Sequence, residues 1–135
     1  MAGYGRTDED WDELVRAGLE FLKGRAKLGR LTSYTELNVI LADRTGLARF
    51  DFEEAGERAA LGYLLGLIVE RDYPTSGLMI SALVQYLDVN DAGPGFYALA
   101  RQLGLLAPGS SKQAQWDFWW RQVKALHERY QGPPR

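Results

Sequence analysis

The 135-residue sequence contains no cysteine and a single histidine, His127. A chain without cysteine has no disulfide, no thiolate nucleophile and no thiolate metal ligand, and one histidine cannot complete a common nitrogen-ligated metal site. Dinucleotide-binding and phosphate-loop glycine patterns are also missing. We therefore expect no metal and no cofactor. A general base at His127 would need a pocket and a partner group, which the sequence does not indicate, so no catalytic residue is named and enzymes are the weaker class.

The sequence also lacks an apolar segment of about 20 residues, the length that a bilayer-spanning helix needs. Its N-terminal part is polar and acidic up to Trp11 and does not resemble a signal peptide. We expect a cytoplasmic protein with no membrane partner. Length and an ordinary composition, 46% apolar and 25% charged, predict one domain over residues 1–135 with flexible tails at 1–6 and 132–135.

The uncharged apolar stretch 59–69 is expected to be the centre of the fold. Charged residues crowd both of its ends, and a helix that is apolar on nearly every side must be surrounded by protein. We predict a central helix from about Phe52 to Asp72, capped at its start by Asp51 with Glu54.

Three further residues define the end and one face of this central helix. Pro74 is predicted to end it. Gly62 and Gly66 lie four residues apart and therefore share a face. Because glycine inside a helix costs about 1 kcal/mol relative to alanine, we expect another element to pack closely on this face as compensation.

Pairs of a capping side chain and a polar residue three positions later predict the starts of three other helices. The pairs are Thr7 with Asp10, Ser33 with Glu36, and Ser110 with Gln113. Gly46 is expected to end the second of these helices, and apolar spacing predicts another helix over 96–103. The short apolar run 78–87 is predicted to be a buried strand, with a helix as the alternative, and 88–95 to be a loop or small wing. The expected fold class is α+β, mostly helical.

Four aromatic residues are concentrated near the C-terminus. Trp116, Trp119 and Trp120 are expected to pack on the core as part of the apolar stripe of the last helix, although base stacking or partner docking is an alternative. Phe118 points to another side of that helix. We therefore treat it as a candidate exposed interface residue.

Charge is distributed unevenly, with an excess of basic residues in 21–49 and in 96–135. Basic side chains in these two blocks could contact phosphates, or could form only a solvated helix end and loop. The candidate nucleic-acid-binding residues of the two blocks are Lys23, Arg25, Lys27, Arg30, Arg121, Lys124 and Arg129.

The segments 29–37 (GRLTSYTEL) and 58–62 (RAALG), followed by Pro74, an apolar run and the turn ending at 95–97 (GFY), carry a distant resemblance. Their order is similar to the DNA-binding domain of the alkylguanine-DNA alkyltransferase and alkyltransferase-like proteins. The resemblance covers about residues 29–97. It implies a winged-helix-like core around the buried central helix, with additional N- and C-terminal helices.

The resemblance also implies roles for two residues. Tyr34 matches a tyrosine near the DNA backbone, and Arg58 lies near the base-displacing arginine, with one extra residue before the glycine in this chain. The reactive Pro-Cys-His-Arg segment is absent, so alkyl transfer to cysteine is excluded.

Two function hypotheses follow, both of binding. The first is nucleic-acid interaction. We expect it to use the basic segments and not the central helix, because Glu53, Glu54 and Glu57 at the start of that helix would repel DNA phosphates. The second is interaction with a protein partner or a second copy, through the glycine face of the central helix or the aromatic last helix. Convergence of residues 23–30 and 121–129 on one face would favour the first hypothesis.

Overall fold

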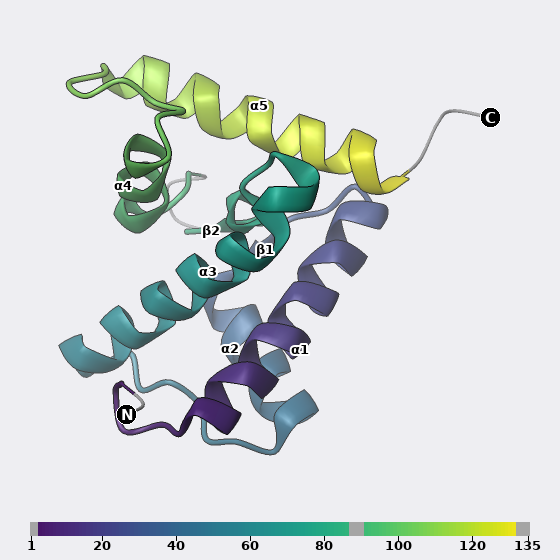
Figure 1. Ribbon diagram of the computed structural model, residues 1–135, viewed down its shortest axis with the longest axis vertical. Helices are drawn as coiled ribbons and strands as arrows, with labels where there is room; N and C mark the ends of the chain where they lie inside the picture. Colours follow the sequence, from purple (N-terminus) through teal and green to yellow (C-terminus); the bar gives the residue numbers. More distant parts are fainter. Residues whose placement is uncertain (1–2, 87–90, 132–135) are drawn as a thin grey trace.

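The computed structural model describes residues 3–86 and 91–131, and it is mostly helical (Figure 1). The helices in these residues are α1 (Asp8–Lys27), α2 (Tyr34–Thr45), α3 (Ala55–Ser76), the 3₁₀ helix η1 (Ile80–Leu83), α4 (Pro94–Gln102) and α5 (Lys112–Gln131). Two short strands, β1 (Thr32–Ser33) and β2 (Val84–Gln85), pair in parallel with Thr32 opposite Val84. The prediction of a mostly helical α+β fold is thereby confirmed.

The hydrophobic core lies where α1, α2, α3, η1 and α5 meet. Helix α1 packs against α2 and α3, and α5 lies across the C-terminal end of α1 and over η1 (Figure 1). Helix α4 lies below the N-terminal half of α5. The largest fully buried side chains come from all of these elements except α4, and they include Leu14, Leu22, Leu41, Ile68, Ile80 and Trp119.

Helix α3 is buried on one side and open on the other. Ala60, Leu64 and Ile68 are completely buried, whereas Tyr63 is 45% exposed and Gly62 is also exposed. The expectation that this helix is surrounded by protein on all sides is therefore wrong. Its composition is apolar all round, but α1 and η1 cover only part of its circumference.

Both predicted ends of α3 are wrong. The helix begins at Ala55 without a side-chain cap, because the carboxylate of Asp51 accepts a hydrogen bond from the backbone N–H of Glu53 instead (3.0 Å). It continues through Pro74 to Ser76 and ends at Gly77, whose φ is +69°. Pro74 and Glu70 are both exposed, so water can bind the Glu70 carbonyl that loses its helical N–H partner.

Most of the other predicted helix ends are confirmed. The Thr7 and Asp10 capping box is complete, and Gly46 ends α2 with φ of +74°. The hydroxyl of Ser33 accepts from the N–H of Glu36 (3.0 Å), but the Glu36 carboxylate accepts from the Thr32 hydroxyl rather than closing the box.

The start of α5 differs from the prediction by one residue. The side chain that caps the first turn is Ser111, which accepts a hydrogen bond from the N–H of Ala114 (3.1 Å). The Ser110 hydroxyl donates to the carbonyl of Ala107 instead.

The predicted strand over 78–87 is largely wrong. Within the described part of this run, only Val84 and Gln85 are in β2, and η1 precedes them. Side chains of α5 satisfy the buried backbone here, because Gln122 Oε1 accepts from Met79 N–H (2.9 Å) and Trp119 Nε1 donates to the Ala82 carbonyl (2.8 Å). Residues 88–90 of the predicted wing lie outside the described residues, and α4 begins directly after Gly93.

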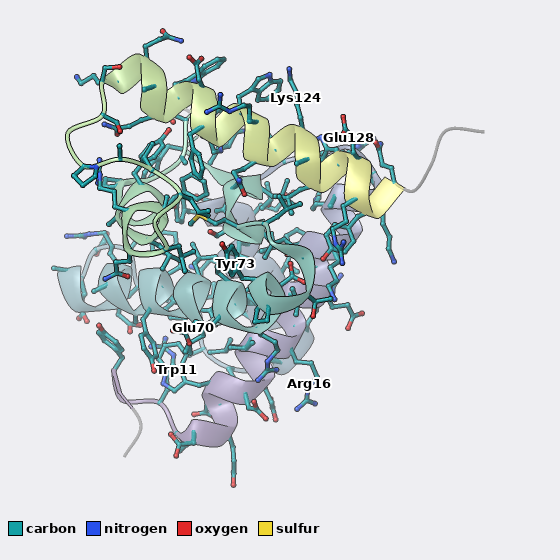
Figure 2. The ribbon with its side chains drawn as sticks, turned by 45° about the horizontal axis from the view of Figure 1, so that its top comes forward. Trp11, Arg16, Glu70, Tyr73, Lys124 and Glu128 are labelled. Carbon is teal, nitrogen blue, oxygen red and sulfur yellow. The ribbon has the colours of Figure 1, made fainter. Side chains whose placement is uncertain are left out.

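The predicted N-terminal tail is fixed to the helices from Gly3 onward. Trp11, which lies between α1 and α3 (Figure 2), donates from Nε1 to the Gly3 carbonyl (3.1 Å). Arg6 pairs with Glu57 (2.8 Å) and lies over the ring of Phe50 (4.0 Å). The hydrogen bond from Arg6 lowers the pKa of Glu57. The predicted tail at 132–135 lies outside the described residues.

Candidate nucleic-acid interface

The two basic segments meet where the C-terminal ends of α1 and α5 lie side by side (Figure 1). His127 Nε2 of α5 is 3.2 Å from the carbonyl oxygen of Arg30. The ammonium group of Lys23 lies 6.0 Å from the ring of Tyr130. The segments 23–30 and 121–129 therefore approach each other at this end of the molecule. Their proximity is the arrangement that was expected to favour the nucleic-acid hypothesis.

Two of the four α1-side cations are held by acidic partners. Arg25 pairs with Glu36 at 3.0 Å and covers the ring of Phe21. Lys23 lies 4.0 Å from Asp72, a buried carboxylate that also accepts a hydrogen bond from Tyr130 (2.9 Å). Burial, followed by this hydrogen bond, raises the pKa of Tyr130. Arg25 and Lys23 are therefore mainly structural cations.

The other two α1-side cations, Lys27 and Arg30, are exposed. Neither forms an ion pair within residues 3–86 and 91–131. Both can therefore offer their full charge to a phosphate.

The cations of α5 are all exposed. Lys124 and Glu128 both project away from the body of the molecule (Figure 2). The Lys124 ammonium lies 5.9 Å from the Trp120 ring, and the Arg129 guanidinium lies 5.6 Å from the Tyr130 ring. Arg121 is one turn before Lys124 and is also exposed. Because an α-helix has 3.6 residues per turn, Arg129 lies on the opposite side of α5 from Trp120, and Lys124 is the cation that shares the side of Trp120.

Trp116 and Trp120 form a half-exposed aromatic pair, 37% and 36% exposed respectively. Their rings are nearly parallel, with an interplanar angle of 16° and centroids 6.1 Å apart. Core packing was the correct prediction for the fully buried Trp119. It holds only in part for the other two, whose rings lie against Trp119 with centroids 6.0 and 5.9 Å away but keep more than a third of their surface exposed. The spacing of 116, 120 and 124 marks a stripe distinct from the buried 119 and 123, and this signal could have identified the pair.

Phe118 is buried, with 7% of its surface exposed, and packs against Phe96 of α4 with ring centroids 5.8 Å apart. The expectation of an exposed interface residue is wrong because α4 covers that side of α5.

Tyr34 and Arg58 lie apart from the cations of α5. The start of α3, where Arg58 lies, is at the opposite end of the molecule from the last turns of α5 (Figure 1). Arg58 donates to the Phe52 carbonyl (2.5 Å), and Tyr34 stacks on Tyr86 with centroids 4.6 Å apart. Both residues line an apolar groove between α3 and α4, which sequence reasoning missed.

The residues that the structure describes hold no cluster of three His, Cys, Asp or Glu side chains suited to a metal ion. Over the same residues, every helix is too short or too polar to span a bilayer. No family model, curated protein or solved structure matches the chain.

Proposed function

We propose that this protein is a non-enzymatic binding module that holds single-stranded nucleic acid along one side of α5. The observation that carries the proposal is the pair of parallel, half-exposed indole rings of Trp116 and Trp120, which continues into Lys124. Aromatic faces stack on unpaired bases, and neighbouring cations contact the phosphates. The buried part of each ring packs against Trp119, and the part that stays exposed is available to stack on a base.

The basic end formed by α1 and α5 extends this surface. Trp116 and Lys124 are eight residues apart, which is about 12 Å along a helix. Beyond Lys124, the contact between His127 and the Arg30 carbonyl brings the exposed Arg30 and Lys27 to the same end of α5. A strand whose bases stack on the indoles would therefore meet several cations as it continues.

A single strand fits this surface better than a duplex. The bases of a duplex are stacked on one another, so indole faces on a helix surface cannot reach them. Insertion of α3 into a groove of DNA is disfavoured by Glu54 and Glu57 at its start. The winged-helix core implied by the alkyltransferase resemblance stays a prediction, and the single-strand proposal does not depend on it.

Fluorescence anisotropy with a labelled oligothymidylate of about 20 nucleotides, its RNA counterpart and a duplex of equal length tests the proposal. We expect both single strands to bind at about 50 mM salt and to bind far more weakly at about 300 mM, because each neutralised phosphate of a single strand contributes about −0.7 to the slope of log K against log salt. The duplex should bind more weakly than either single strand.

Substitutions locate the binding. Trp120→Ala should weaken single-strand binding about tenfold through lost stacking, and Trp120→Phe should restore part of it. Lys124→Ala should reduce the salt slope, whereas Arg49→Ala, which removes an exposed cation elsewhere, should not. Absence of single-strand binding at low salt, or equal losses for Lys124→Ala and Arg49→Ala, would contradict the proposal.

The hypothesis of a protein partner or a second copy stays a prediction, and so does a cytoplasmic location. Burial removes Phe118 from the residues that could support a protein interface. The glycine face of α3, which the same hypothesis used, is open and lines the apolar groove.

A further inference from the structure

The groove between α3 and α4 has a volume of about 630 Å³. Its floor is the side of α3 that carries Gly62 and Gly66, and one wall is α4 with Phe96 and Leu99. The stacked rings of Tyr34 and Tyr86 also line it. This volume lies within the range of about 300–1,000 Å³ that is usual for small-molecule sites, and such sites are mostly apolar.

Gly62 and Gly66 keep this groove open. A Cβ built at either position meets no atom within 4 Å, so the expectation of close packing on this face is wrong. Two glycines inside a helix cost about 2 kcal/mol relative to alanine, and packing within the described part of the chain does not compensate for that cost. Larger side chains at these positions would occupy the space that the groove now provides.

The charge of the groove favours a negatively charged ligand. Arg58 is the one ionised side chain among the described lining residues. Its hydrogen bond to the Phe52 carbonyl fixes the guanidinium in place and leaves other N–H groups available.

Ser81 adds one hydroxyl group to the lining of the groove. The residue is 5% exposed, but its hydroxyl oxygen is not a buried orphan, because the buried side-chain atoms without a partner in the described residues are Asp72 Oδ2 and Gln85 Oε1. The hydroxyl is therefore open to the groove, where water or a polar atom of a ligand can bond to it.

We infer that the groove binds a small amphiphilic carboxylate, such as a medium-chain fatty acid or an aryl carboxylate. The apolar body would lie over Gly62 and Gly66 and the carboxylate would pair with Arg58. A peptide segment fits less well, because each of its residues brings backbone N–H and C=O groups that need partners, and the groove surface is mostly apolar. This inference concerns a different surface from α5 and is independent of the nucleic-acid proposal.

Displacement of the fluorescent apolar anion 1-anilinonaphthalene-8-sulfonate tests the inference, with dodecanoate, dodecanol and dodecylammonium as competitors of equal chain length. We expect dodecanoate to displace the dye at a concentration at least about tenfold lower than dodecanol, and dodecylammonium to be the weakest. Dodecanol competing as well as dodecanoate would overturn the assignment of an anion. Circular dichroism on the same samples checks whether the competitors leave the fold intact.

Variants distinguish the groove from other apolar surfaces. Gly66→Leu should abolish dodecanoate binding without loss of thermal stability, because nothing obstructs the new side chain and leucine favours helix. Gly24→Leu, a glycine of α1 that is also unobstructed, should bind dodecanoate normally. Arg58→Gln should weaken dodecanoate about tenfold and leave dodecanol unchanged.

Three results would overturn the inference. The first is unchanged dodecanoate binding by Gly66→Leu. The second is equal loss of dodecanol and dodecanoate binding in Arg58→Gln. The third is a dimer of the unmodified protein that Gly66→Leu converts to a monomer, which would make the groove an interface between copies. Oligonucleotide binding by Gly66→Leu should be unchanged whichever of these results is obtained.

Discussion

A Cβ built on Gly18 of α1 would lie 2.6 Å from Cδ1 of Ile68 in α3. Gly18 and Ile68 are both buried, and Ile68 is completely inaccessible to solvent. The close helix approach that glycine permits therefore occurs between α1 and α3 at Gly18, and not at Gly62 or Gly66, which face open space.

This contact predicts opposite effects for two alanine substitutions in the same helix. Gly24→Ala should raise the free energy of unfolding by about 1 kcal/mol, because its Cβ meets nothing and alanine favours helix. Gly18→Ala should lower it by about 1 kcal/mol or more, since the buried Ile68 must move within a filled core. Urea unfolding measures both values, and a gain for Gly18→Ala equal to that for Gly24→Ala would show that α1 and α3 are not in close contact there.

Replacing the buried polar side chain of Asn38 is expected to lower the free energy of unfolding. It donates to the Phe50 carbonyl (2.9 Å) and accepts from the Phe50 N–H (2.8 Å), and both residues are buried. Asn38→Leu would leave two backbone groups without partners, each costing about 1–3 kcal/mol. We expect a loss of about 2–4 kcal/mol in the free energy of unfolding.

Asp43→Ala, on the exposed side of the same helix, is the matched control for Asn38→Leu and should change stability by less than about 0.5 kcal/mol. Similar values for the two variants would contradict the structure of the segment that joins α2 to α3.

Two tyrosines with raised pKa values are expected to make the protein less stable at high pH. Burial, together with Tyr86, raises the pKa of Tyr34 from 10.0 to about 12. A hydrogen bond from the backbone of Gly93 has the opposite, smaller effect of lowering this pKa. Burial, with the hydrogen bond to Asp91, also raises the pKa of Tyr97. A raised pKa means that the folded state favours the protonated hydroxyl. The stability contribution is therefore complete below pH 10 and is lost as the pH rises through the folded-state pKa.

Urea unfolding at several values between pH 9 and about pH 12 checks this expectation. In that window, stability should fall with pH at up to about 1.4 kcal/mol per pH unit for each of the two groups. Tyr34→Phe should reduce the slope between pH 10 and about pH 12, and Tyr97→Phe should reduce it as well. An unchanged slope in Tyr34→Phe would mean that its hydroxyl is not buried against Tyr86.

Local signals in the sequence predicted those parts of the fold that depend on local interactions. Thr7 with Asp10 and the glycine at Gly46 act through backbone groups within one turn, so their patterns were sufficient. Asp51 has the same kind of pattern, yet it bonds to Glu53, because a capping side chain can satisfy a turn as readily as a helix. The sequence alone does not distinguish these two outcomes.

The parts that depend on distant residues could not be predicted. The run 78–87 is apolar and short, and its conformation is decided by Gln122 and Trp119, which bind its backbone from about 40 residues away. In the candidate interface, Lys27, Arg30 and Lys124 are exposed, and their role in binding stays a prediction. The groove could not be predicted from the sequence, because an apolar helix face has the same composition whether a neighbouring element or open space lies beside it.

The central claim, that the Trp120 side of α5 binds a single strand, is tested most directly by the indole N–H signals in ¹H–¹⁵N NMR spectra during titration with an oligothymidylate. The indole N–H groups of Trp11 and Trp119 are held by the carbonyls of Gly3 and Ala82, and their signals should stay in place. The signals of Trp116 and Trp120 should shift together as the strand is added. Four unchanged signals at low salt, or shifts of Trp11 and Trp119 as large as that of Trp120, would contradict the account.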